Sequence, residues 1–152
     1  MSYDDAMESL SNDALKLIKN NQVIGLGSGR AATALVKSLA KLIKLKNYNI
    51  KGIPTSLQIK LIAEKAGIPL IESDQVNHID IVFDGADQID FDKYVIKGGG
   101  GALLRENILF SLAKKVVVMA DKTKFVKKFT RTVPIEIHPL ARNSVIRSIK
   151  KL

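Results

Sequence analysis

The sequence predicts an α/β fold with a Rossmann-like, mostly parallel sheet covered by helices. Short apolar runs that suit buried strands alternate with longer segments whose apolar residues recur at helical spacing. A glycine-rich turn joins the first apolar run to the helix after it. This alternation is typical of βα units, whose crossover connections place successive strands parallel.

The first third of the chain supplies two helices and two strands of this pattern. Ser2 is placed to cap the first helix, and the carboxylates of Asp4 and Asp5 suit its positive end. We expect helices over residues 2–20 and 31–46, and strands over residues 23–26 and 48–53.

The turn Gly27-Ser28-Gly29 between the first strand and the second helix is a candidate anion site. Backbone N–H groups at a helix N-terminus are open to a ligand, and the helix dipole favours negative charge there. The alternative is that the glycines only let the strand turn into the helix. The spacing departs from the dinucleotide-binding fingerprint, and no acidic residue closes the next strand to hold a ribose. We therefore do not expect NAD.

The same alternation continues to residue 120. Thr55 or Ser56 is placed to cap a third helix, which Gly67 ends, and a hydroxyl in this position can also face a ligand. Further strands are expected over residues 68–71, 79–83 and 115–120, and a further helix over residues 102–113. We assign residues 1–130 to one Rossmann-like catalytic domain. Residues 131–152, with a strand over 133–138 and then a helix, are expected to begin a small α+β second domain.

The formal net charge of +9 comes almost entirely from the last quarter of the chain. Residues 1–113 hold thirteen basic and thirteen acidic side chains, whereas residues 114–152 hold eleven basic and two acidic ones. A basic excess is typical of proteins that bind nucleic acids. The chain has no nucleic-acid recognition motif and no aromatic stacking platform, so we predict a solvated basic surface and no nucleic-acid partner.

Composition also bears on location and on metals. The chain has no cysteine, no apolar run long enough to span a membrane, and an acidic N-terminus. We therefore predict a cytoplasmic protein without membrane association. His78 and His138 lie apart from any cluster with metal-ligand spacing, so we assign no metal.

Residues 84–106 bring together the side chains of a candidate active site. Asp84 and Asp87 follow a strand, and Lys97 leads into four consecutive glycines, Gly98 to Gly101. Such a run suggests a backbone that adopts positive φ or approaches a ligand closely. If the glycines open the helix that carries Glu106, their N–H groups and Lys97 would form a cradle for an oxyanion.

These residue types suit proton transfer next to a carbonyl group. That chemistry needs a base on carbon, donors for the enediolate oxygens and an acid for the oxygen protons. Glu106, Lys97 with the glycine amides, and the aspartate pair fit these roles. The alternative for Asp84 and Asp87 is a turn favoured by Asp-Gly after a strand. Lys124, after the strand over residues 115–120, would counter an anionic substrate or lie on the surface.

Three segments resemble signature segments of the ribose-5-phosphate isomerase family, type A. They are Asp84-Gly85-Ala86-Asp87, Lys97-Gly98-Gly99-Gly100 and Leu104-Arg105-Glu106, which occur in the family's order and spacing. The resemblance also includes VIGLGSG (residues 23–29), the segment around residues 119–124, and PIEIHPLARNSV (residues 134–145).

The resemblance implies interconversion of ribose 5-phosphate and ribulose 5-phosphate through an enediolate, without metal or organic cofactor. It implies that Glu106 moves the proton between C1 and C2, that Asp84 assists ring opening and proton transfer at oxygen, and that Asp87 and Lys97 position the sugar oxygens. The matching substrate-binding positions are Ser28, Gly29, Arg30, Ala31, Gly85, Ala86, Gly98, Gly99, Gly100 and Lys124.

Two departures from the family pattern qualify these expectations. The glycine loop usually reads Gly-Thr-Gly-Ser-Thr, whereas here Arg30 and Ala31 follow Gly29, which replaces two hydroxyls and adds a cation. Family chains are also longer by roughly a third and associate as dimers or tetramers. We expect a homo-oligomer if the missing C-terminal part is not required. The alternative function is a sugar-phosphate-binding module without catalysis.

Overall fold

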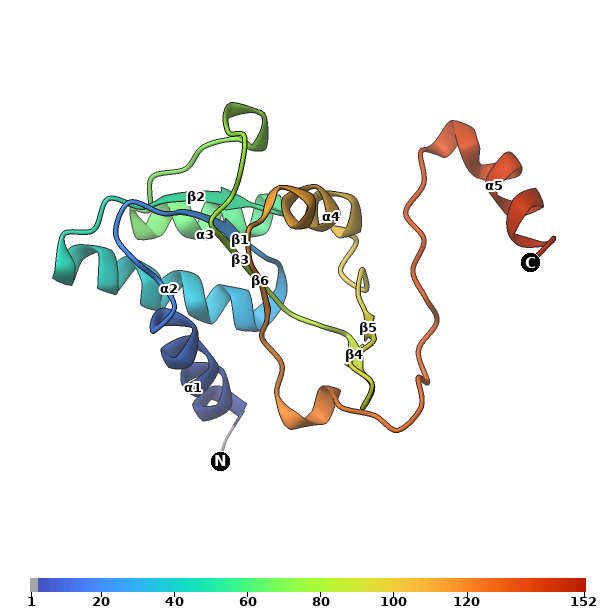
Figure 1. Ribbon diagram of the computed structural model, residues 1–152, viewed down its shortest axis with the longest axis horizontal. Helices are drawn as coiled ribbons and strands as arrows, with labels where there is room; N and C mark the ends of the chain where they lie inside the picture. The colour runs from blue at the N-terminus through green and yellow to red at the C-terminus, as the bar shows by residue number, and fades with distance from the viewer. Residues whose placement is uncertain (1–2) are drawn as a thin grey trace.

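A four-stranded parallel sheet forms the centre of the computed structural model, which describes residues 3–152 (Figure 1). Its strands are β1 (Val23–Leu26), β2 (Lys51–Pro54), β3 (Ile81–Asp84) and β6 (Val116–Val118). They lie in the order β2-β1-β3-β6, and each neighbouring pair is parallel. The predicted α/β fold with a mostly parallel sheet is confirmed.

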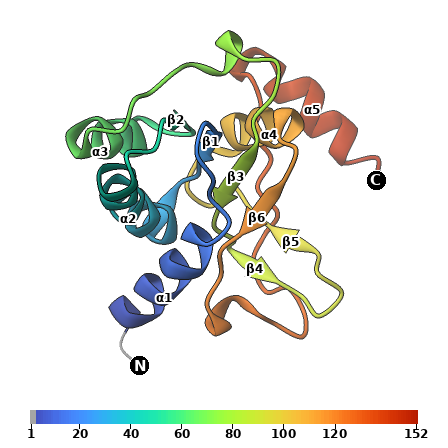
Figure 2. The same cartoon turned by 60° about the vertical axis from the view of Figure 1, so that its left-hand side comes forward.

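Helices cover both faces of this sheet. The α-helices are α1 (Tyr3–Leu15), α2 (Gly29–Lys46), α3 (Leu57–Ala66), α4 (Leu103–Leu112) and α5 (Arg142–Ile149). Figure 2 shows α1, α2 and α3 on one face and α4 on the other. Short 3-10 helices occur at η1 (Ser73–Gln75), η2 (Lys122–Lys124) and η3 (Pro139–Ala141).

The two faces of the sheet bury separate apolar clusters because alternate strand residues point to opposite faces. Ile24 and Phe83 pack with α2 and its neighbours, including Leu35. Val82 packs on the opposite face with Leu109 of α4. Successive residues of β3 therefore anchor the two helical layers, which fixes Asp84 at the end of a strand that is buried on both faces.

The helix ends follow the predicted chemistry in α3. Ser56 Oγ accepts a hydrogen bond from the Ile59 N–H at 3.3 Å, and Gly67 ends the helix with φ +79°. The first helix is shorter than predicted: α1 ends at Leu15, and the next three residues form tighter bonds to carbonyls three positions back. The predicted cap Ser2 lies outside the described residues.

Two predicted strands are wrong. Residues 68–71 contribute only an isolated parallel bridge between Leu70 and Gly52 of β2. Residues 133–138 form no strand. Their alternating pattern suits a strand, but a strand requires a neighbour for its N–H and C=O groups, and Pro134 has no N–H to donate.

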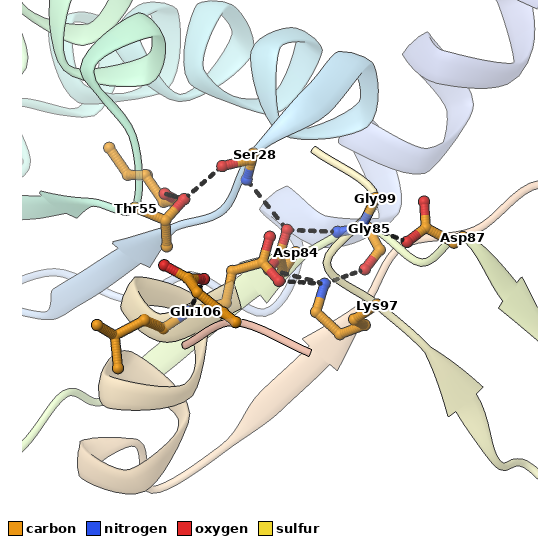
Figure 3. Close-up of polar contacts among 11 residues, drawn as sticks. Ser28, Thr55, Asp84, Gly85, Asp87, Lys97, Gly99 and Glu106 are labelled. Carbon is orange, nitrogen blue, oxygen red and sulfur yellow. Dashed lines mark hydrogen bonds and ion pairs between the residues drawn. The ribbon is translucent and has the colours of Figure 1, made fainter. Parts of the chain in front are cut away.

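A small antiparallel pair that the sequence pattern does not predict lies beside the main sheet. It consists of β4 (Gln88–Ile89) and β5 (Val95–Ile96). This hairpin brings Lys97 back toward the end of β3, as Figure 3 shows. Its position therefore decides whether Asp84 and Lys97 meet.

The C-terminal segment leaves the compact part of the molecule after Glu136, whose Oε2 accepts a hydrogen bond from the Leu104 N–H of α4 at 2.6 Å. Figure 1 shows α5 set apart from the sheet. None of the α5 residues is buried. No helix within residues 3–152 is long and apolar enough to cross a membrane.

Candidate active site

A cleft of about 320 Å³ lies at the carboxyl end of the parallel strands, where α/β folds commonly bind ligands. All the site residues predicted from the sequence line it. They are Ser28, Gly29, Arg30, Ala31, Asp84, Gly85, Ala86, Asp87, Lys97, Gly98, Gly99, Gly100, Glu106 and Lys124. The structure thus brings together residues from β1–α2, β3, the hairpin, α4 and η2, whose functional roles stay predictions.

Asp84 is fixed at the end of β3 by the loop after β1. One carboxylate oxygen, Oδ1, accepts hydrogen bonds from the backbone N–H of Ser28 at 3.0 Å and of Gly85 at 2.8 Å. Asp84 is only 1% exposed. A Cβ at position 27 would collide with this carboxylate, so Gly27 permits the close approach of the loop. This aspartate therefore joins two strand ends rather than capping a solvent-exposed turn.

Lys97 connects the two most buried carboxylates of the cleft (Figure 3). Its Nζ lies 2.9 Å from Asp84 Oδ2 and 3.3 Å from Glu106 Oε2, and it donates to the Gly85 carbonyl at 2.6 Å. The Lys97 side chain is 13% exposed. Within the described residues, no other donor reaches Asp84 Oδ2 or Glu106 Oε2. Among residues 3–152, the ammonium therefore supplies the only charge compensation in direct contact with these oxygens.

Glu106 projects from the first turn of α4 into the buried side of the cleft. Burial and the negative charge of Asp84 raise the pKa of the Glu106 carboxyl, whereas the neighbouring Lys97 opposes this rise. The net effect is a raised pKa. A carboxylate with a raised pKa is a better proton acceptor, so Glu106 has the electrostatic setting of a general base.

The glycine run forms a loop before α4. Gly98 and Gly101 have φ of +93° and +72°, which explains glycine at these two positions. The Gly99 N–H donates to Asp87 Oδ2 at 2.8 Å, and the Gly101 N–H to the Gly98 carbonyl at 3.0 Å. The glycines directly precede α4, whose N-cap is Ala102, but two of the amides expected in the anion cradle, those of Gly99 and Gly101, have partners within the protein.

The glycine-rich loop after β1 presents Ser28 at the start of α2. Ser28 Oγ makes no capping bond but lies 2.8 Å from Thr55 Oγ1, at the end of β2. Thr55 is completely buried and also bonds the Leu26 carbonyl at 3.1 Å. The sequence offered Thr55 or Ser56 as the helix cap, and the structure assigns the cap to Ser56 and directs Thr55 toward the cleft loop.

Cationic side chains lie on the open side of the cleft. Arg30 comes from the first turn of α2, and Lys124 from η2. Asp121 lines the cleft beside them, and hydrogen bonds from the Thr123 hydroxyl and N–H hold the pKa of its carboxyl below the usual value. This side of the cleft therefore combines two cations with one aspartate that stays ionised near neutral pH.

Sequence reasoning missed Arg131, which contacts a predicted site residue. One guanidinium nitrogen of Arg131 lies 3.5 Å from Asp87 Oδ1. The buried amide of Gln88 holds this segment: Oε1 accepts from the N–H groups of Thr130 and Arg131 at 3.0 and 3.1 Å, and Nε2 donates to the Thr130 hydroxyl at 2.7 Å. No local pattern could indicate contacts across 42 and 43 residues.

The remaining lining residues that were not among the predicted site residues are Met7, Met119, Ala120 and Asp121. Three of them belong to a segment that the family resemblance included, so only Met7 lacked any sequence signal. A search of residues 3–152 finds no group of three or more acidic or histidine side chains arranged to hold a metal ion. The side chains present are suited to acid–base chemistry with electrostatic stabilisation.

Comparisons with known proteins identify similar chains across nearly the whole sequence. The sequence model of one family, ribose 5-phosphate isomerase A (phosphoriboisomerase A), matches residues 51–152. A ribose-5-phosphate isomerase A from Trichodesmium erythraeum is 41% identical over 148 residues, which cover 95% of this chain. A protein of the same name from Staphylococcus aureus is 38% identical over 141 residues, or 91% of this chain.

Solved structures show the same relationship. Ribose 5-phosphate isomerase A from Methanocaldococcus jannaschii superposes with a TM-score of 0.89 at 37% identity, over 99% of this chain and 68% of the other. A D-ribose-5-phosphate isomerase in complex with phospho-erythronic acid has the same TM-score at 35% identity, over 99% of this chain and 67% of the other. The chain spans 62% of the length of the curated relatives above.

Proposed function

Because this chain belongs to the ribose 5-phosphate isomerase A family, we propose that it interconverts D-ribose 5-phosphate and D-ribulose 5-phosphate. The reaction is an aldose–ketose isomerisation of the non-oxidative pentose phosphate pathway. The observation that carries the proposal is the buried contact of Lys97 with both Asp84 and Glu106 in the cleft. This arrangement supplies a base, a cation for developing negative charge and a second carboxylate.

Glu106 is the proposed base. It removes the proton from C2 of the open-chain aldose, the C–H electron pair forms the C1–C2 double bond, and the carbonyl π pair moves to O1. The resulting enediolate is uncharged at carbon and negative at oxygen. Proton transfer between the oxygens and return of the proton from Glu106 to C1 give the ketose. One group thus accepts and returns the same proton.

Lys97 and the aspartates serve the oxygen atoms in this proposal. The Lys97 ammonium is within reach of both carboxylates, so an enediolate oxygen in the cleft would meet a cation already held in place. Asp84 would assist ring opening and proton transfer at oxygen. Asp87, anchored by Gly99, would position a sugar hydroxyl.

The phosphate group is assigned to the cationic side of the cleft. Arg30 and Ala31 stand in the first turn of α2, where N–H groups and the helix dipole favour an anion. Lys124 adds a second cation from η2. The other proposed substrate-binding positions have no side chain or only a methyl group, which leaves room for the ligand. They are Gly29, Gly85, Ala86, Gly98 and Gly100.

Domain organisation, assembly and location also stay predictions. We propose that residues 131–152 begin a second α+β domain, in agreement with the separation of α5 from the sheet. A homo-oligomer is proposed from the family, and a cytoplasmic location from the absence of cysteine. Light scattering of the purified chain would measure its oligomeric state.

A coupled assay with ribose 5-phosphate in the presence of EDTA tests the proposed reaction. We expect turnover by the unmodified chain and a decrease of about 10²- to 10⁴-fold in Glu106→Gln, because the variant lacks the base. Glu64→Gln, an exposed change on α3, is the matched control and should keep full turnover. Undiminished turnover in Glu106→Gln would exclude Glu106 as the base.

Calorimetry distinguishes the second candidate function. Because the chain spans only part of the length of its relatives, the second candidate function is a sugar-phosphate-binding module without catalysis. Binding of ribose 5-phosphate without turnover by the unmodified chain would select that function. Absence of both binding and turnover would contradict both functions.

A further inference from the structure

We propose that Thr55 is a positioning residue that orients the Ser28 hydroxyl as a hydrogen-bond acceptor for a sugar hydroxyl. This inference rests on the proposed function for the identity of the ligand. Thr55 is not among the residues that line the cleft, whereas Ser28 is. The contact between their hydroxyls joins the end of β2 to the loop after β1 (Figure 3).

The direction of the hydroxyl protons follows from the number of hydrogen bonds that each arrangement allows. Thr55 Oγ1 lies 3.1 Å from the Leu26 carbonyl, which can only accept, and 2.8 Å from Ser28 Oγ. If Thr55 donates to Leu26 and Ser28 donates to Thr55, both bonds form. If Thr55 donates to Ser28, the bond to Leu26 is lost. Thr55 is completely buried, where a hydrogen bond left unmade is costly, so the first arrangement is favoured.

The consequence concerns what Ser28 offers to the cleft. A hydroxyl group has one proton and two lone pairs, and the proton of Ser28 is engaged by Thr55. The lone pairs remain for a ligand. Ser28 Oγ is therefore suited to accept from a sugar hydroxyl and unsuited to donate to a phosphate oxygen. The phosphate is left to the N–H groups and cations of the neighbouring residues.

The backbone of Ser28 links this arrangement to the catalytic group. Its N–H donates to Asp84 Oδ1 at 3.0 Å, and Asp84 Oδ2 in turn faces Lys97 at 2.9 Å. Thr55, Ser28, Asp84, Lys97 and Glu106 thus form one continuous polar chain (Figure 3). Thr55, at the buried end of this series of contacts, therefore holds the loop that carries Ser28. The Ser28 N–H binds Asp84, and the lone pairs of the Ser28 hydroxyl are left for the ligand.

Binding measurements in the Glu106→Gln background test the proposal without turnover. Thr55→Val replaces the hydroxyl by a methyl of similar size, and Thr55→Ser keeps the hydroxyl. We expect Thr55→Val to weaken ribose 5-phosphate binding by about 3- to 10-fold, in line with one hydrogen bond, and Thr55→Ser to restore it. Inorganic phosphate binding should be unchanged in both variants.

A double-mutant cycle separates positioning from a general structural effect. Ser28→Ala should weaken ribose 5-phosphate binding by a similar factor, and Thr55→Val should add nothing in the Ser28→Ala background. The proposal would be overturned if the factors by which Ser28→Ala and Thr55→Val weaken binding multiplied in the double variant. It would also be overturned if Thr55→Val alone caused no loss of ribose 5-phosphate binding. If Ser28→Ala weakened the binding of inorganic phosphate and of ribose 5-phosphate equally, the proposal would also be overturned. This comparison uses only Ser28→Ala, so it tests the proposal even if Thr55→Val does not fold. Failure of the proposed function is recognised separately, because the unmodified chain would then show no turnover of ribose 5-phosphate in the coupled assay.

Discussion

The Lys97 ammonium lies 2.9 Å from Asp84 Oδ2, where the side chain of the aspartate is almost completely shielded from water. A second carboxylate, that of Glu106, is 3.3 Å from the same nitrogen. One cation therefore compensates two buried anions. Removing one member of a buried ion pair costs more than removing a surface pair, because the remaining charge is left without water or a partner.

Lys97→Met is expected to lower the free energy of unfolding by about 3 kcal/mol at pH 8. Lys97 opposes the rise in the pKa of Glu106, so without the ammonium the folded-state pKa of Glu106 rises further. The stability of the variant therefore falls as pH increases through that pKa, and the destabilisation by Lys97→Met is smaller at pH 5. Urea unfolding at the two pH values measures this difference. Lys114→Met removes an exposed ion pair with Asp80 and should cost less than about 1 kcal/mol. Equal losses in the two variants would contradict the central role of Lys97.

The pH dependence of turnover should reveal the raised pKa of Glu106. Burial first, and then Asp84, raise that pKa, and a general base must be deprotonated to accept a proton. Activity is therefore expected to fall on acidification with an apparent pKa above that of an ordinary glutamate. The acid limb of kcat/KM against pH measures it for the free enzyme. If the apparent pKa of this acid limb were at or below the ordinary pKa of a glutamate, Glu106 would be excluded as the group whose deprotonation controls activity.

Local sequence patterns predicted the parts of the fold that depend on nearby residues. The apolar run before Asp84 forms a buried strand, and the capping of α3 by Ser56 and its end at Gly67 follow from side-chain chemistry within one or two turns. The cleft also follows, because parallel strands end at the same edge of a sheet. The glycines and charges after those strands therefore converge.

The parts that were not predicted depend on partners far away in the sequence. The hairpin strands β4 and β5 have only two residues each, too few for an alternating pattern. The Gln88 side chain is satisfied by residues 130 and 131, which lie in a segment without regular structure. Residues 133–138 have the alternation of a strand but no neighbouring strand. Each case depends on whether a tertiary partner is present or lacking.

Arg131→Met is expected to alter substrate affinity more than stability. The guanidinium lies 3.5 Å from Asp87, and the Arg131 side chain is 57% exposed, so the ion pair should contribute less than about 1 kcal/mol to folding. Less compensation of Asp87 would make the cleft more negative. We expect KM for the anionic substrate to rise about two- to fivefold, as an energy of this size implies.

The acid limb of kcat/KM against pH gives an independent measurement in Arg131→Met. The negative charge of Asp87 contributes to the raised pKa of Glu106, so the limb should move to higher pH when Arg131 is lost. Arg142→Met removes an equal charge from exposed α5 and controls for net charge. If both variants change KM alike, the effect belongs to overall charge and not to Asp87.

Gly99→Ala tests whether Asp87 requires the close approach of the glycine loop. An alanine Cβ at position 99 would lie 2.7 Å from Asp87 Oδ1, whereas a Cβ at position 100 would meet nothing within 4 Å. Neither glycine has positive φ, so the two substitutions restrict the backbone similarly. Gly99→Ala must displace the Asp87 carboxylate or the loop and thereby lose the 2.8 Å bond from the Gly99 N–H.

We expect kcat/KM of Gly99→Ala to fall about 10- to 100-fold, as for a hydrogen bond to a charged group, and kcat/KM of Gly100→Ala to fall less. Equal decreases in the two variants would show that the loop backbone, and not the anchoring of Asp87, limits the reaction.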